Sequence, residues 1–301
     1  MKTEQQLTME RPQSQPTDDR ARSSTLKSIL LHVQDNASLE RTLESALSLA
    51  RASSAHLSCI HITPIQAYVA FDSFGGVFVM KDVLKAIDEQ AAKLRARLEA
   101  KLSTEDVSWD YEEITGDVPS QIISKAALGD IVVTGREPHR QDFVGSTTGL
   151  LGDLLSRCRS PLFIPGDDRA DVDPPGTAVI AWDGSYEAAN ATRSSMGLLK
   201  LATRVCVIQV AEEKAQGFPG TKMLEYLSRH DIHAELIVQD PPGGYADQEV
   251  VAATLVSHAR GLGASYMVMG GYSHSRIGEF VFGGVTRTLL KECPLSLVIA
   301  R

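Results

Sequence analysis

The sequence predicts an α/β protein made of two doubly wound units in tandem, each with a five-stranded, mainly parallel sheet flanked by helices. Three observations lead to this prediction. The chain has 301 residues, a length typical of two domains rather than one. Its second half alternates short apolar runs with amphipathic helical segments. The chain also repeats itself, because residues 129–166 and 264–301 align without a gap at their glycines and apolar positions.

The repeat suggests where the two units begin and end. A shift of 135 residues brings Gly135 onto Gly270 and Cys158 onto Cys293. The first strands match at a shift of 148, so the first half has 13 additional residues, which we place within 68–80. Residues 1–24 are polar and lack aromatics, and an acidic, proline-containing stretch joins the halves. We therefore predict a disordered tail at 1–24, a first unit at 25–166, a linker at 167–175 and a second unit at 176–301.

The elements of the second half follow in order along the sequence. Apolar runs rich in β-branched residues predict strands at 178–182, 205–210, 234–238, 266–269 and 296–300. Helices are predicted to start at Ser185 and to cover 222–229, 250–260 and 286–291. In the first half, helical spacing predicts an amphipathic helix over 81–101 whose core-facing residues are Leu84, Ile87, Ala91, Leu94 and Leu98.

Composition excludes several classes of protein. The net charge of −8 argues against a nucleic-acid-binding protein, which needs a basic face. No run approaches the roughly 18 apolar residues of a membrane-spanning helix, and the polar N-terminus has no secretory signal. Four cysteines without a C-x-x-C spacing fit a reducing compartment. We expect a cytoplasmic protein that does not associate with membranes.

The densest functional signal is the glycine-rich segment 270–287. Glycines between a strand and a helix let the backbone approach a ligand, since no Cβ stands in the way. A helix that begins near Gly284 would direct its free N–H groups and its positive dipole end at the loop, which suits a phosphate. The alternative is that these glycines only permit positive φ angles and close packing of helix against sheet.

The motifs of the second half resemble those of a universal stress protein domain. The carrying residues are the Ala-Trp-Asp-Gly-Ser turn at 181–185, the Gly-Tyr-Ser-His-Ser-Arg loop from 271, the Phe-Gly-Gly-Val-Thr-Arg block from 282 and the closing strand. The resemblance extends over 25–166 with weaker sequence similarity, so the chain resembles a tandem universal stress protein. That family has an adenine nucleotide alpha-hydrolase-like fold, and the resemblance implies that the last strands, 163–165 and 298–300, pair with each other. Pro165 should limit this pairing at one edge.

The same resemblance implies an ATP site in the second unit. By position, Asp183 and Val210 would hold the adenine, and Gly270, Ser273, Gly283, Gly284 and Val285 would hold the ribose and phosphates. Ser273 replaces a glycine of the family pattern, and Gly284 replaces a serine or threonine. The site is therefore degraded but keeps its backbone donors.

The first unit departs further from the nucleotide-binding pattern. Gly135 persists and Asp35 fills the acidic position, but Pro138, Thr148 and Gly149 occupy the rest of the loop. Proline removes an N–H group and fixes φ, which disfavours a phosphate site. We predict that this unit is structural and binds no nucleotide or binds it weakly.

Several polar residues have simpler interpretations. Asp35 and Asp183 each follow a strand, where aspartate commonly closes a turn. His32, His56 and His61 lack a metal-ligand spacing, so we expect packed or hydrogen-bonded imidazoles rather than a metal site. Cys158 and Cys293 fall on equivalent apolar positions and are predicted to be buried and unreactive.

These observations favour a non-catalytic stress-response or signalling protein that binds adenine nucleotide in its second unit. No nucleophile–base pair is found, so the chain is predicted not to be an enzyme. One alternative is an adaptor without nucleotide that acts through protein contacts, including aromatics of residues 68–80. Another is a weak ATPase in which Arg276 or Arg287 stabilises phosphate charge. Partners could include a second copy of the chain.

Overall fold

The computed structural model describes residues 25–64, 70–71, 77–78, 81–136, 149–168, 172–211, 217–242, 247–271 and 283–301. The predicted tail at 1–24 lies outside the described residues, as do Pro138, Thr148, Ser273 and Arg276. Most of the additional segment 68–80 also lies outside them, except for two short strands, β3 (Ala70–Phe71) and β4 (Val77–Phe78), which pair antiparallel.

One ten-stranded sheet runs through the described chain in the order β10-β9-β8-β11-β12-β7-β6-β1-β2-β5. Its first-half strands are β1 (Ser28–Val33), β2 (His56–Pro64), β5 (Trp109–Gly116), β6 (Ile131–Val133) and β7 (Leu162–Ile164). Its second-half strands are β8 (Thr177–Ala181), β9 (Arg204–Val210), β10 (Ala234–Gln239), β11 (Ala264–Gly270) and β12 (Ser296–Ala300). All neighbours are parallel except β7 and β12. The predicted α/β class is confirmed, and both halves have the same strand order.

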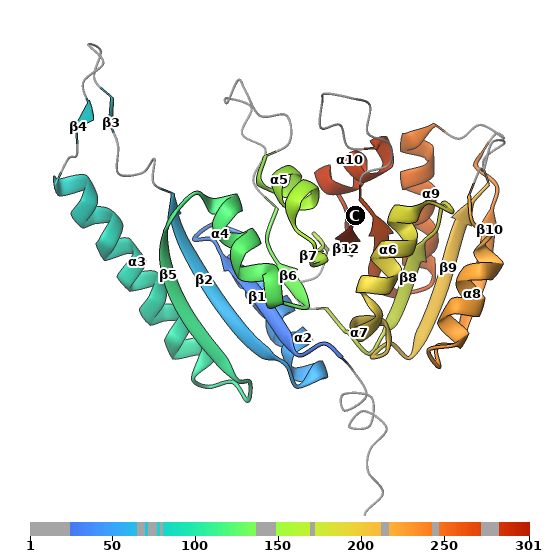
Figure 1. Cartoon of the computed structure of the whole chain (residues 1–301), viewed down its shortest axis with the longest axis horizontal. Coiled ribbons are helices and arrows are strands. Elements are labelled where there is room, and N and C mark those ends of the chain that lie inside the picture. The colour runs from blue at the N-terminus through green and yellow to red at the C-terminus, as the bar shows by residue number, and fades with distance from the viewer. Residues whose placement is uncertain are drawn as a thin grey trace, which may run out of the picture.

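Helices cover both faces of the sheet (Figure 1). One face carries α2 (Leu39–Ser53), α3 (Lys81–Leu102), α6 (Tyr186–Ser194), α7 (Met196–Leu199) and α8 (Gly220–Ser228), whose buried side chains share one apolar core. The other face carries α4 (Val118–Lys125), the 3-10 turn η2 (Ala126–Leu128), α5 (Gly149–Arg157), α9 (Gln248–Gly261) and α10 (Gly284–Lys291), which form a second core. Both faces of the strands are therefore buried, which explains their nearly continuous apolar sequences.

Side-chain caps fix where three of these helices begin. Asp117, Ser185 and Asp247 each accept a hydrogen bond from a backbone N–H three residues later. Each satisfies a donor that the first helical turn leaves free. The predicted helix start at Ser185 is confirmed.

The helix predicted over 81–101 forms as α3, but only part of it packs as expected. Leu94, Leu98 and Leu102 are at most 3% exposed, whereas Leu84, Ile87 and Ala91 are only half-buried. The helical spacing located the apolar stripe correctly. The N-terminal part of that stripe does not reach the core.

The two halves meet at the β7–β12 pair in the middle of the sheet (Figure 1). Leu297, Val298 and Ile299 lie opposite Ile164, Phe163 and Leu162, so the expected pairing of the last strands is confirmed, and it is antiparallel. Pro165 follows the last paired residue of β7, in agreement with its predicted effect.

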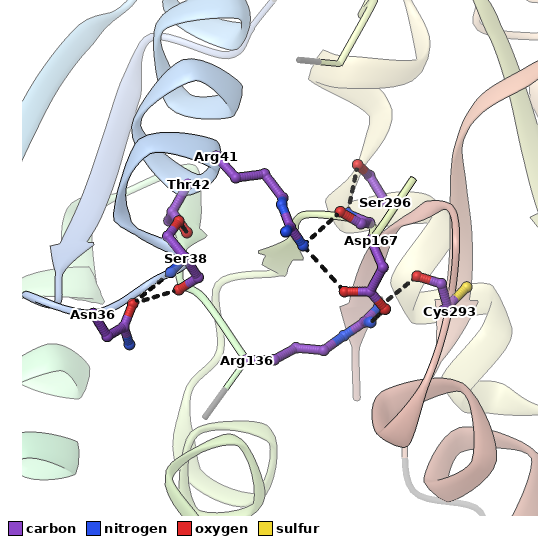
Figure 2. A network of polar contacts seen from close by, with 9 residues as sticks. Asn36, Ser38, Arg41, Thr42, Arg136, Asp167, Cys293 and Ser296 are labelled. Carbon is purple, nitrogen blue, oxygen red and sulfur yellow. Dashed lines mark hydrogen bonds and ion pairs between the residues drawn. The ribbon is translucent and has the colours of Figure 1, made fainter. Parts of the chain in front are cut away.

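A polar network reinforces this junction (Figure 2). Arg41 Nη1 lies 3.1 Å from Asp167 Oδ1, and Arg136 pairs with the other carboxylate oxygen of Asp167. Arg136 Nη2 also donates to the Cys293 carbonyl oxygen at 3.1 Å, while the Gly166 N–H donates to Ser296 Oγ at 3.1 Å. Two first-half arginines thereby fix the start of the predicted linker against the second half.

Among the described residues, no helix combines the length and apolarity that a membrane crossing requires.

Candidate functional site

The sheet brings three predicted site segments of the second half to one edge. The strands β8, β9 and β11 are parallel neighbours, with β9 and β11 on opposite sides of β8. Their carboxyl ends carry Asp183, Val210 and Gly270, and α10 begins at Gly284. The strand order reverses at β8, and ligands of doubly wound sheets bind beside such a reversal.

Asp183 lies in the turn between β8 and α6. Its Oδ1 atom accepts a hydrogen bond from the Ser185 N–H at 2.9 Å, so the carboxylate has the turn-closing role that the sequence offered as an alternative. The residue is nevertheless exposed, which leaves its carboxylate accessible to a ligand donor. Gly184, with φ of +80°, supplies the left-handed step of this turn.

Val210 ends β9 beside this turn. Its side chain is 9% exposed and belongs to the same apolar core as Ala181 and Ile208. It presents a mostly buried apolar side chain at the edge where the base was predicted.

Gly270 has a packing role that the sequence did not distinguish from ligand binding. A Cβ at this position would lie 2.6 Å from the Ala188 backbone nitrogen, in the first turn of α6. Gly270 therefore lets a strand end approach the first turn of a helix, whether or not a ligand binds. The equivalent Gly135 is enclosed by side chains instead, since a Cβ there would lie 2.4 Å from the Ser38 Oγ.

The start of α10 is partly occupied by a neighbouring side chain. A Cβ at Gly284 would lie 1.5 Å from the Gln248 Oε1 atom, so the Gln248 amide takes the place of a side chain at 284. Gln248 is the first residue of α9, which Asp247 caps. The hydroxyl that the family pattern has at 284 is thus replaced by an amide from another helix. Gly283 and Val285 flank this point and are half-buried.

An exposed aromatic pair next to Asp183 was missed by sequence reasoning. Tyr186 and Phe218 are 77% and 45% exposed, and their rings meet edge to face with centroids 5.2 Å apart. The Phe218 N–H donates to the Gly184 carbonyl oxygen at 2.9 Å, and the Trp182 indole N–H donates to the Phe218 carbonyl oxygen at 3.0 Å. A tyrosine directly after the Asp-Gly-Ser turn could have indicated an exposed aromatic side chain at this edge. Its contact with Phe218 could not be predicted, because the two residues are far apart in the sequence.

The corresponding edge of the first half is held by protein contacts. Asp35 Oδ1 lies 3.0 Å from Arg97 Nη2, and Arg136, which follows Gly135, is bound at the junction. Gly149, the predicted counterpart of Gly284, starts α5 with φ of +53°.

The first-half histidines do not gather into a metal site. Burial, with a smaller effect of His61, lowers the pKa of His32 from 6.5 to about 4, and the His32 Nδ1 lies 3.1 Å from Thr134 Oγ1. His56 contacts Ser108 and Asp110, while burial lowers the pKa of His61. Within the described ranges, no three His, Cys, Asp or Glu side chains are grouped to bind a metal ion.

The four cysteines are free thiols. Cys293 is buried as predicted, whereas Cys158 is only half-buried. Burial raises the pKa of both thiols, and it raises the pKa of Cys59 to about 12. Thiols with raised pKa are poor nucleophiles, which supports the prediction that they are unreactive.

The fold places the chain in the mixed α/β class with a mostly parallel sheet flanked by helices, and this is also the fold of universal stress proteins. No family model and no curated protein matches the sequence. A universal stress protein from Archaeoglobus fulgidus DSM 4304 is similar over 92% of this chain and 99% of its own, with a TM-score of 0.69 and 11% identity.

Two structures from Pseudomonas aeruginosa show the same likeness. A putative universal stress protein from strain UCBPP-PA14 has a TM-score of 0.54 and 13% identity, and a functionally unknown protein from strain PAO1 has a TM-score of 0.55 and 14% identity. Each covers 93% of this chain and 94% of its own. At these identities the likeness concerns the fold.

Proposed function

We propose that the chain is a tandem universal stress protein, a non-catalytic stress-response or signalling protein that binds adenine nucleotide in its second unit. The observation that carries this proposal is the edge of the second half, where Asp183, Val210 and the start of α10 surround the reversal of strand order. Fold likeness to universal stress proteins over nearly the whole chain supports it.

The residues fit the two ends of an adenine nucleotide to different degrees. The exposed Asp183 carboxylate can accept from an exocyclic amine, and Val210 offers an apolar contact for a ring. The backbone of Gly283, Gly284 and Val285 opens an eight-residue helix, α10, whose first N–H groups suit phosphate. Gln248 narrows this phosphate end, so we expect binding to rely more on the base than on the terminal phosphates.

The proposal assigns unequal roles to the two halves. Residues 25–166 form a structural unit without a nucleotide site, and 176–301 form the binding unit. We propose that the protein functions in the cytoplasm and does not bind nucleic acid. The net charge of −8 supports the latter point.

Calorimetry with ATP, AMP and adenosine tests the nucleotide site. We expect one site per chain and similar affinities for ATP and AMP. Asp183→Ala should weaken adenosine binding about tenfold, because a buried or partly buried hydrogen bond to a charged group contributes roughly 1.5 kcal/mol. Asp106→Ala, an exposed change between α3 and β5 of the first half, is the matched control. Absence of heat with all three ligands, together with no co-purified nucleotide, contradicts the proposal.

A second candidate, an adaptor that binds no nucleotide, is favoured by two observations. Gly270 is explained by helix packing alone, and Gln248 occupies the position of the missing hydroxyl. The exposed pair Tyr186 and Phe218 would then contact a protein. Tyr186→Ala tests this candidate, because it should weaken partner capture while leaving the protein folded. The ATPase alternative requires phosphate release that Arg287→Ala abolishes.

A further inference from the structure

The strand β10 ends the sheet in the second half, and among the described residues its one strand neighbour is β9. Figure 1 shows β10 beside α8, at the opposite margin of the sheet from β5. An edge strand presents unpaired N–H and C=O groups, which can bind another strand unless charges, prolines or a bulge prevent it. The two margins of this sheet differ in how well they are protected.

The margin at β5 is acidic, whereas the margin at β10 is almost uncharged. The exposed carboxylates of β5 belong to Asp110, Glu112 and Glu113. The one charged residue in β10 is Glu235, and its Oε2 atom lies 2.8 Å from Arg204 Nη2 on the neighbouring strand β9. Within β10 there is also no proline. This edge therefore lacks the charges and prolines that normally block the addition of a strand.

The register with β9 shows which peptide groups of β10 point outward. The Ala211 N–H donates to the Gln239 carbonyl oxygen at 2.8 Å, so Gln239 directs its peptide groups toward β9. In a parallel pair, alternate residues of a strand direct both groups to the same neighbour. Leu236 and Val238 have the other parity, so their N–H and C=O groups point away from β9.

Val238 leaves apolar surface uncovered at the same edge. Its side chain is 56% exposed, although β10 lies against α8. Side chains alternate between the two faces of a strand, so Val238 shares a face with Leu236, which packs against the core on the α8 side. Ile237 lies on the opposite face and packs against the second core. An uncovered valine thus lies directly beside outward-pointing backbone groups.

A second copy of β10, antiparallel about a two-fold axis at Ile237, matches this edge residue by residue. Leu236 of one copy then lies opposite Val238 of the other, and their outward peptide groups form the hydrogen-bonded pair of an antiparallel ladder. The same pair covers the exposed valine with a leucine side chain. Glu235 lies opposite Gln239, a carboxylate against an amide donor, so no like charges meet.

We propose that β10 pairs in this register with β10 of a second copy of the chain, giving a dimer with one continuous sheet. The self-complementary register and the uncovered Val238 carry the assignment. The contact is isologous, so it closes after two copies, whereas pairing of β10 with β5 would continue head to tail and would meet the carboxylates of β5. Pro241 and Pro242, which lack N–H groups, end the paired segment. The dimer does not depend on the nucleotide site.

Sedimentation equilibrium of the full-length protein tests the dimer, and we expect a reversible monomer–dimer equilibrium. Val238→Lys puts a cation against the apolar Leu236 of the other copy and should weaken dimerisation at least tenfold. Leu128→Lys is the matched control, because Leu128 is 93% exposed in η2 of the first half and the charge change is the same. It should leave the dissociation constant within twofold of the wild type, and circular dichroism checks that both variants fold.

Two opposite changes at Gln239 test the register. Gln239→Glu sets a carboxylate against Glu235 of the other copy and should weaken the dimer about threefold, whereas Gln239→Lys should strengthen it about threefold. A loss of packing cannot produce effects of opposite sign at one position. Leu128→Glu and Leu128→Lys measure the effect of net charge alone.

Three results overturn the proposal. The first is a monomer at every concentration up to about 100 μM, which places any dissociation constant above the micromolar range. The second is a dimer that responds equally to Val238→Lys and Leu128→Lys, since the contact then lies elsewhere. The third is growth beyond the dimer, which indicates head-to-tail pairing with another edge. Asp183→Ala should dimerise like the wild type, so failure of the nucleotide site is distinguishable from failure of the dimer.

Discussion

Gly166 joins the two halves at a point where no side chain can be accommodated. A Cβ there would lie 2.4 to 2.7 Å from the backbone of Pro294, Leu295 and Ser296, which cannot move without disturbing β12. We expect Gly166→Ala to lower the free energy of unfolding by about 1–3 kcal/mol through overpacking. Urea denaturation measures this change. Gly261→Ala is the control, because a Cβ at Gly261 meets nothing within 4 Å, and this variant should be neutral or slightly stabilised.

His32 makes stability depend on pH. Its pKa is about 4 in the folded protein and 6.5 when exposed, so the unfolded chain binds a proton that the folded chain excludes between these values. Stability should therefore be highest above pH 6.5 and fall as the pH is lowered toward 4, by about 3 kcal/mol in total. In His32→Gln this part of the slope should disappear. His56→Gln, at a half-buried position on the edge of the same strand pair, should retain it.

The two parts of α3 should respond differently to truncation. Leu98→Ala removes a side chain that is 2% exposed and should cost about 2–4 kcal/mol, whereas Leu84→Ala, at a half-buried position, should cost about 1 kcal/mol or less. Urea denaturation of both variants compares them directly. Equal losses would show that the N-terminal part of α3 is packed as firmly as the rest.

The helices and strands could be predicted from the sequence, whereas contacts between distant residues could not. Strands and helices of the second half were located because their apolar runs and caps are local features, as at Ser185 and Asp183. The contacts of Gln248 with Gly284 and of Tyr186 with Phe218 join residues far apart in the chain. No periodicity encodes such contacts, so neither the Gln248 side chain at the start of α10 nor the aromatic pair could be foreseen. Partial burial of α3 was missed because spacing identifies an apolar face but not what covers it.

At the scale of the whole molecule, the continuous sheet predicts that the two halves unfold together. The chain has two tryptophans, Trp109 in β5 and Trp182 after β8, so each half has its own fluorescent reporter. Trp109→Phe leaves the reporter of the second half, and Trp182→Phe leaves the reporter of the first. In each variant, the denaturation midpoint from tryptophan fluorescence should coincide with the midpoint from circular dichroism.

Arg136→Met should make the two halves unfold at different denaturant concentrations. It removes the bond to the Cys293 carbonyl oxygen, which crosses the junction shown in Figure 2, and the ion pair that holds Asp167 at the start of the linker. Lys125→Met, which removes a surface pair with Glu112 within the first half, is the control and should leave the transitions coincident. Transitions that stay together in Arg136→Met would show that β7–β12 pairing alone couples the halves.

The β7–β12 pairing has a consequence for how the protein behaves on dilution. Two separate chains joined through such strands would come apart as their concentration falls, whereas here the partners are covalently tethered and remain together at any concentration. The strands left at the margins are β5 and β10, and β5 carries Asp110, Glu112 and Glu113. Carboxylates on an edge strand discourage pairing with a further strand, so the β5 edge is protected. The last strand of each half is paired within the chain itself.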